Sequence, residues 1–326
     1  MRWILLLAVV GHANAASFAQ RPPAGQSPEP TVAGFEDGFF ATSGVARFQL
    51  IQGRICLDAP RHRKGSQQRE TDLVYESVTV TSERGIPSLH YVYQSADHHI
   101  KLSVQKASTV RVESWLPKLS QRSVLMQPCR GPVTWSVSQG DQTEEYSAAT
   151  LLHLRHADRL NFDKHHARLI QSLLRGRSLQ KLSRETQSAL VGSLRDSTRL
   201  PTTTEILDQV ADLRSKSRRR RVMAERQLLS WGTPVVATLQ TLASEDLDAE
   251  QAGRVRSILK RLRPRVDDTA ASLAKLLVND RDYWVQIADS LPADHQSLAN
   301  QHFLRFEGSE LNPAFPSTTR VARRRE

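Results

Sequence analysis

The spacing of the hydrophobic residues changes once along this chain, near Tyr146, and that change limits the folds it can adopt. Between about Gly53 and Tyr146, apolar residues alternate with polar ones, which is typical of antiparallel strands with one buried face. The alternating sets are Ile55 and Leu57; Val78 and Val80; Leu89, Tyr91 and Tyr93; Ile100, Leu102 and Val104; and Val133, Trp135 and Val137. Beyond Tyr146 the apolar residues recur at helical spacing. We therefore expect an α+β protein, with a β-rich domain over 35–148 (sandwich-like or an open sheet) followed by an all-α domain over 149–308.

Residues that commonly cap helices precede the helical runs. The candidates are Asp163, Ser183, Thr202–Thr204, Thr233, Asp248 and Asp280, each just before a run with apolar residues three and four apart. A short polar side chain at such a position accepts a hydrogen bond from a free N–H of the first helical turn. These residues therefore predict the starts of successive helices.

Two stretches of the helical half share a common plan. They are Leu247–Leu262 (LDAEQAGRVRSILKRL) and Leu291–Phe306 (LPADHQSLANQHFLRF), whose first residues are 44 positions apart. With the helix that precedes each, they form two paired units across Val222–Phe306, which resembles HEAT repeats. The resemblance implies an interaction scaffold and names no ligand. Two such units are fewer than a stable solenoid needs, so the helices from 149 onward are expected to complete the same stack.

The N-terminus has the features of a secretory signal peptide. Met1-Arg2 is followed by the apolar run Trp3–Val10, and Ala13 and Ala15 provide the small residues of a cleavage site. We expect a signal peptide over 1–15, a disordered linker over 16–34 and a disordered tail over 309–326. The mature chain is expected to have no transmembrane segment and to be exported to a periplasm, the cell envelope or the exterior.

The only two cysteines, Cys56 and Cys129, both fall in the β-rich half. In an oxidising compartment an even pair in one domain favours a single disulfide. Two buried free thiols are the alternative.

The excess positive charge lies in the middle of the chain. Residues 151–221 contain 16 Lys and Arg against 7 Asp and Glu, whereas 222–326 contain 14 of each. The densest run is Arg218–Arg221, which could contact a polyanion. Four consecutive arginines point in different directions around a helix, so such binding would be non-specific and salt-dependent, and no specific nucleic acid is expected. A solvated basic junction is the alternative.

A histidine group gives the chain its one candidate metal site. His153 and His156 are three residues apart, which places them on one face of a helix, and His165 and His166 follow. The pattern lacks His-Glu-x-x-His, and solvated or capping histidines are the alternative. No nucleophile elbow, phosphate-binding loop or dinucleotide fingerprint occurs, so no catalytic residue and no cofactor is assigned.

These observations favour an exported, non-enzymatic protein that binds a protein or cell-envelope component through its helical surface. A metal-dependent hydrolase that uses the histidine group, and a polyanion-binding protein that uses the arginine run, are the alternatives.

Overall fold

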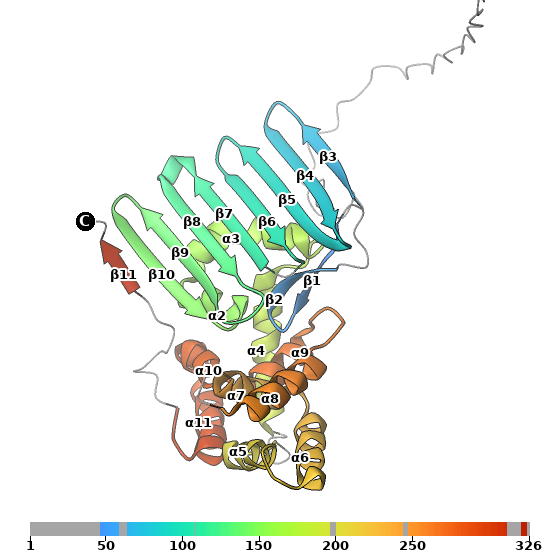
Figure 1. The fold of residues 1–326 in the computed structure, drawn as a ribbon. Coiled ribbons are helices and arrows are strands. Elements are labelled where there is room, and N and C mark those ends of the chain that lie inside the picture. The colour runs from blue at the N-terminus through green and yellow to red at the C-terminus, as the bar shows by residue number, and fades with distance from the viewer. Residues whose placement is uncertain are drawn as a thin grey trace, which may run out of the picture. The chain divides into compact units, whose positions relative to one another are not determined.

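The computed structural model describes residues 46–58, 64–107, 109–195, 200–243, 247–311 and 321–324. These residues belong to one compact unit, Glu36–Glu326. The predicted signal peptide and linker lie outside the described residues. The α+β prediction is confirmed, because an antiparallel sheet precedes a helical region (Figure 1). The HEAT-like character of the helices stays a prediction.

The sheet is a single meander in which each strand pairs with its neighbour in sequence, so the open-sheet alternative describes it. Its eight consecutive strands are β3 (Gly65–Glu70), β4 (Val74–Glu83), β5 (Ile86–Ser95), β6 (His99–Gln105), β7 (Thr109–Leu116), β8 (Gln121–Gln127), β9 (Val133–Gln139) and β10 (Gln142–Ala148). A short 3₁₀ turn, η3 (Pro117–Leu119), connects β7 to β8.

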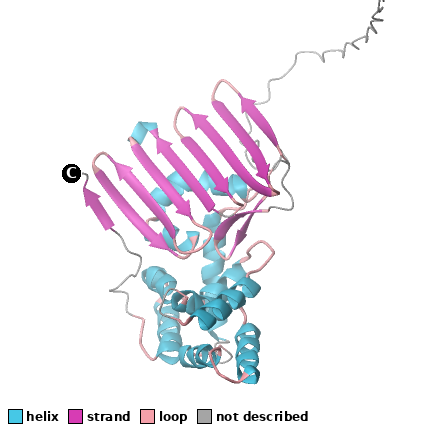
Figure 2. Ribbon diagram, in the orientation of Figure 1, coloured by secondary structure: helices cyan, strands magenta, loops and turns pink. Residues whose placement is uncertain are grey.

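Among the described elements, helices and a short hairpin cover one face of this sheet, and none covers the other, which we call the open face (Figure 2). The inward residues of β4, β5, β6 and β9 include all the apolar members of the alternating sets named above, and all of these are buried, as is Glu76 of β4. On β7 and β8 the inward positions include the polar residues Ser114, Gln121, Ser123 and Gln127, also buried. The covered face therefore carries an apolar part and a polar part.

The helical region follows β10 directly. Its helices are α2 (Leu151–Ala157), α3 (Arg159–Leu173), α4 (Leu179–Arg195), α5 (Thr203–Asp212), α6 (Arg218–Trp231), α7 (Val236–Leu242), α8 (Ala249–Leu262), α9 (Ala270–Leu277), α10 (Arg281–Ile287) and α11 (Ala293–Glu307), with 3₁₀ turns η5 (Thr233–Val235) and η6 (Ala288–Ser290). Helix α3 lies across the covered face of the sheet (Figure 1). None of the described helices is long and apolar enough to cross a membrane.

Three of the predicted caps are confirmed. Thr202 forms a capping box with Glu205, and Asp248 and Asp280 accept hydrogen bonds at the starts of α8 and α10. The other three caps are wrong. Thr233 lies inside the 3₁₀ turn η5, which begins after Gly232. Helix α3 begins earlier, capped by Asp158, and α4 begins at Leu179, which places Ser183 inside that helix.

A short hairpin of β1 (Phe48–Ile51) and β2 (Arg54–Leu57) completes the covered side. The side chain of Gln127 serves Ile55 as a strand partner would, since its Oε1 accepts from Ile55 N–H at 3.0 Å and its Nε2 donates to Ile55 O at 2.7 Å. At the hairpin turn Gly53 has φ of 69°, and a Cβ there would meet the Cβ of Thr150 at 2.7 Å. The turn therefore needs glycine both for its backbone conformation and for the close approach to α2.

The predicted disulfide is not present, because Cys56 and Cys129 are both free thiols. The thiol of Cys56 accepts a hydrogen bond from Arg263 at 3.0 Å. The guanidinium of Arg54 holds the loop that contains Cys129, donating to Pro128 O and Gly131 O at 2.6 and 2.7 Å. Arg263 thus binds the thiol of Cys56, and Arg54 binds the loop of Cys129. The pKa of Cys56 is raised, mainly by burial.

The C-terminal residues return to the sheet. Within the predicted tail, Val321–Arg324 form β11, which pairs antiparallel with Gln142–Glu145 of β10. The prediction of a disordered tail did not include this strand.

Candidate functional site

The four histidines of the candidate metal site divide into two pairs that face different neighbours. His153 and His156 of α2 face α10 and α4, whereas His165 and His166 of α3 face the sheet. No group of three or more His, Cys, Asp or Glu side chains suited to a metal ion occurs in the described part of the chain. The structure therefore does not bring these four residues together as ligands.

His153 connects the starts of two helices. Its Nδ1 lies 2.8 Å from the Oγ1 of Thr150, which caps α2, and its Nε2 lies 3.3 Å from the Oδ2 of Asp280, which caps α10. Burial alone would raise the pKa of Asp280, but His153 and backbone N–H groups outweigh it and lower that pKa. The row of hydroxyl, imidazole and carboxylate has the order of a catalytic triad. Its hydroxyl, however, is an N-cap that accepts from the N–H groups of Leu152 and His153. Thr150 and His153 are buried and Asp280 is half-buried, so the row holds α2 against α10.

His156 also has a structural position. Its Nε2 lies 3.0 Å from the Oγ of Ser183 in α4 and 3.4 Å from the hydroxyl of Tyr283 in α10. Burial, followed by the charge of Arg155, lowers the pKa of His156 to about 4. The imidazole is therefore neutral at neutral pH and joins three helices.

The second pair lies in a polar network beneath α3. Ser114 of β7 is 2.8 Å from His165 Nδ1 and 2.7 Å from His98 Nε2, and His165 Nε2 is 3.2 Å from Gln121 Oε1. Burial lowers the pKa of both His98 and His165 to about 4. Next to them, His166 Nε2 lies 3.0 Å from Ser123 Oγ, to which Trp135 donates at 2.7 Å. Burial, followed by the charge of His165, lowers the pKa of His166 well below its usual value.

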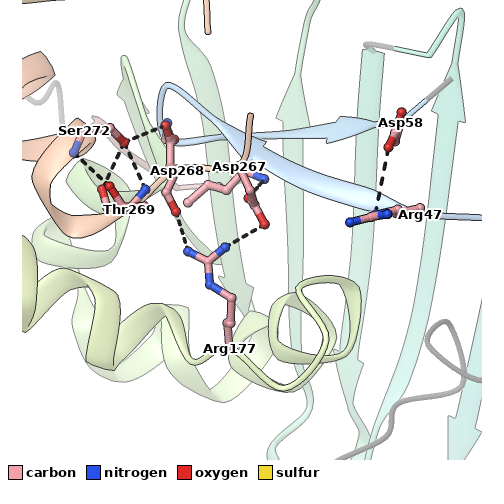
Figure 3. A network of polar contacts seen from close by, with 9 residues as sticks. Arg47, Asp58, Arg177, Asp267, Asp268, Thr269 and Ser272 are labelled. Atoms are coloured by element: carbon pink, nitrogen blue, oxygen red, sulfur yellow. Dashed lines mark hydrogen bonds and ion pairs between the residues drawn. The ribbon is translucent and has the colours of Figure 1, made fainter. Parts of the chain in front are cut away.

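A second polar cluster joins the helical region to the β1–β2 hairpin (Figure 3). Asp267 Oδ1 accepts from Leu50 N–H at 2.7 Å, and Asp268 Oδ2 accepts from Gly53 N–H at 2.7 Å. Arg177 donates to Asp267 Oδ2 at 2.6 Å and to the carbonyl of Asp268. Burial raises the pKa of Asp268 to about 6. These adjacent carboxylates anchor the hairpin to the helices.

The arginine run forms the first turn of α6. Arg218, Arg219 and Arg220 are exposed, whereas Arg221 is half-buried and donates to Ser215 O at 2.8 Å. Arg221 also lies 3.4 Å from Glu250 of α8. Arg218, Arg219 and Arg220 are thus exposed to solvent, whereas Arg221 binds the turn between α5 and α6.

Two further cations, which were not part of the predicted contact, extend the run. Arg214 and Lys216 are exposed in the turn between α5 and α6. We call Arg214, Lys216, Arg218, Arg219 and Arg220 the basic tip. In the described ranges no acidic side chain lies within 4.0 Å of their charged atoms. Both residues stand within four positions of Arg218 in the sequence, and this proximity could have placed them in the predicted contact.

Comparisons with protein-family models, with curated proteins and with solved structures found no match.

Proposed function

We propose that this chain is an exported binding protein without catalytic activity, and that it engages an acidic polymer or surface of the cell envelope through the basic tip. The observation that carries the proposal is the arrangement of charge at the start of α6. A helix N-terminus carries partial positive charge from its free N–H groups, and each additional cation there costs about 0.3–1 kcal/mol. Helix α6 begins with four arginines and has no acidic residue in its first turn.

The N-cap position does not relieve this repulsion. Ser217 precedes α6, but its side chain makes no capping hydrogen bond. A phosphate, sulfate or carboxylate group at this position would neutralise the arginines and accept from the free N–H groups. The sequence thus keeps an arrangement that is unfavourable in the free protein and favourable with an anion bound.

The chemistry of the tip limits the kind of partner. Exposed guanidinium groups pair with phosphates or sulfates in many orientations, and these side chains have no rigid support that would select one geometry. We therefore expect binding that depends on charge density, weakens steeply with salt and reads no sequence.

Heparin chromatography tests the proposal with heparin as the polyanion. The triple variant Arg218→Gln, Arg219→Gln, Arg220→Gln should elute at clearly lower salt than the wild type, and the slope of log affinity against log salt should fall by about 2–3. The matched control is Arg184→Gln, Arg256→Gln, Arg265→Gln, which removes the same charge from exposed positions elsewhere. It should elute close to the wild type. Equal losses in the two variants, or no loss in either, would contradict a specific role for the tip.

The N-terminal pattern supports the export part of the proposal. In a cell with a secretory pathway, the purified mature protein should begin near Ala16, as read by intact mass. A mature protein that retains Met1–Ala15 in a cytoplasmic fraction would refute export and leave the heparin experiment unaffected.

A further inference from the structure

The open face of the sheet is a second surface with its own chemistry. Its side chains come from the residues that alternate with the buried ones, and across the middle of the sheet they form rows. One row joins Val92, Lys101 and Glu113, and the next joins His90, Ser103 and Arg111, with Met126 following on β8. No described helix covers these positions in Figure 2, and they are exposed or half-buried.

A hollow of about 240 Å³ lies at the centre of this face, lined by both rows. Ser103 stands opposite His90 on one side and Arg111 on the other, and Lys101 lies two residues before it on the same strand and face. A short side chain among long ones leaves a depression. Ligand pockets commonly measure about 300–1,000 Å³, so this hollow suits only a small molecule.

The charges around the hollow are not balanced. Arg111 Nε donates to Glu113 Oε1 at 2.7 Å, which neutralises that pair. Lys101 stands directly opposite Glu113 in the register, yet in the described ranges no carboxylate lies within 4.0 Å of its ammonium group. Because Arg111 holds the carboxylate that Lys101 would otherwise use, the hollow has one unneutralised cation on its rim.

The rim also has an apolar side. Val92, the cross-strand partner of Lys101, lines the hollow. Met126 stands next to that lining, with its sulfur 3.4 Å from Arg111 Nη1. A ligand that satisfies both sides needs an anionic group for Lys101 and a short carbon chain that lies on Val92 and extends toward Met126.

We propose that this hollow is a binding site for a small carboxylate that carries a short apolar chain. Lys101 contacts the carboxylate, and Ser103 and His90 offer further hydrogen bonds. The site is separate from the basic tip, and it does not depend on the proposed function.

The chain offers a direct readout, because it has 3 methionines. Met126 lies beside the hollow, and Met223 is exposed on α6 beside the basic tip. The protein is labelled with [¹³C-methyl]methionine and titrated with hexanoate, and the Met223 signal is assigned with Met223→Leu. Hexanoate should shift the Met126 methyl signal saturably, with a dissociation constant of about 1 mM as expected for so small a ligand. The Met223 signal should not move.

Two comparisons make the result decisive. Hexanol, the neutral analogue, should produce no saturable shift, and Lys101→Gln should weaken hexanoate binding about tenfold. The matched variant Lys118→Gln removes an exposed lysine from the turn after β7 and should bind hexanoate as the wild type does. The proposal is overturned if Met126 shows no saturable shift, if hexanol binds equally well, or if Lys101→Gln changes nothing.

The same labelled protein separates this proposal from the proposed function. A heparin fragment should move the Met223 signal and leave the Met126 signal in place. If hexanoate fails to shift the Met126 signal while heparin shifts Met223, the hollow is wrong and the basic tip stands. The reverse result refutes the basic tip and leaves the hollow in place.

Discussion

His165 of α3 and Ser114 of β7 lie 2.8 Å apart, from Nδ1 to Oγ, and both side chains are buried. This contact and its neighbours hold the helix to the polar part of the covered face. Because burial lowers the pKa of both His98 and His165 to about 4, the network is stable only while its imidazoles are neutral.

The first prediction concerns the loss of folding stability at acidic pH. The ordinary pKa of a histidine, near 6.5, applies in the unfolded chain, which therefore binds more protons than the folded chain between about pH 6.5 and 4. Stability should be complete above pH 6.5 and fall as the pH drops toward 4, by up to about 2 kcal/mol per histidine at pH 5. Urea unfolding at pH 7.5 and pH 5.0 measures this loss.

Variants assign the loss to the network. His165→Gln should be less stable than the wild type at pH 7.5 but should lose less on going to pH 5.0. His90→Gln replaces an exposed histidine and should keep the wild-type difference between the two pH values. Identical pH differences in all three proteins would show that the buried network does not titrate as described.

The second prediction concerns Asp268, whose contribution to stability falls as the pH rises, opposite to that of the buried histidines. Burial raises the pKa of Asp268 to about 6, above its ordinary 3.8, so the folded chain binds this proton more readily than the unfolded chain. Its contribution to stability is complete below about pH 4 and is lost as the pH rises through 6. Asp268→Asn keeps an acceptor for Gly53 N–H and removes the buried charge, so it should gain up to about 3 kcal/mol over the wild type between pH 4 and pH 8.

Asp268→Ala provides the contrast to that variant. It also removes the buried charge but leaves the N–H of Gly53 without its partner, so it should be about 1–3 kcal/mol less stable than Asp268→Asn at acidic and at alkaline pH alike. Urea unfolding of the wild type and both variants at pH 4.5 and 8 tests the pair. A wild type and an Asn variant that change in parallel with pH would contradict the raised pKa.

The third prediction concerns the hairpin. Gln127→Leu preserves the approximate volume but leaves both backbone groups of Ile55 without partners in a buried position. We expect a loss of about 2–4 kcal/mol in the free energy of unfolding. Gln105→Leu, at an exposed position on β6, should change stability by less than about 0.5 kcal/mol. Equal effects of the two substitutions would mean that the Gln127 side chain does not act as a strand partner.

The fourth prediction links stability to binding at the basic tip. Ser217→Asp places a capping carboxylate before α6 and should raise stability by about 0.5–1 kcal/mol. The same carboxylate occupies the position proposed for an anion, so heparin retention should fall. Ser217→Ala should leave both properties near their wild-type values, because the Ser217 side chain makes no capping bond. Thermal unfolding and heparin elution together measure the opposed changes, and a rise in retention with Ser217→Asp would refute the idea.

The strands that the sequence predicted clearly are those whose inward residues are apolar, such as Leu89, Tyr91 and Tyr93 on β5. The alternation is weak on β7 and β8 because Ser114 and Ser123 point inward. Serine at such positions reads as solvent-exposed unless its partners are known. Those partners are His165 and His166, on a helix that follows later in the chain.

The sequence groups the four histidines by proximity, but the contacts of each one could not be derived from spacing. His153 and His156 share a helix face, as expected, yet each meets a different partner on α10 or α4. Which residue of a distant helix lies opposite depends on packing that no local pattern encodes. The basic tip, by contrast, is a local feature, so Arg218, Arg219 and Arg220 could be named from the sequence, although Arg214 and Lys216 were left out.

The anchoring of the β1–β2 hairpin has a consequence for the order in which a newly made chain can fold. Gly53 and Asp268 are 215 residues apart, so at roughly 5–20 residues per second their bond can form only about 10–40 s after Gly53 is made. Strands β4–β10 pair with neighbours in sequence and can assemble during that interval. The first two strands of the described chain are thus among the last to gain all their partners, and a ribosome must deliver the start of α9 before the hairpin is secured.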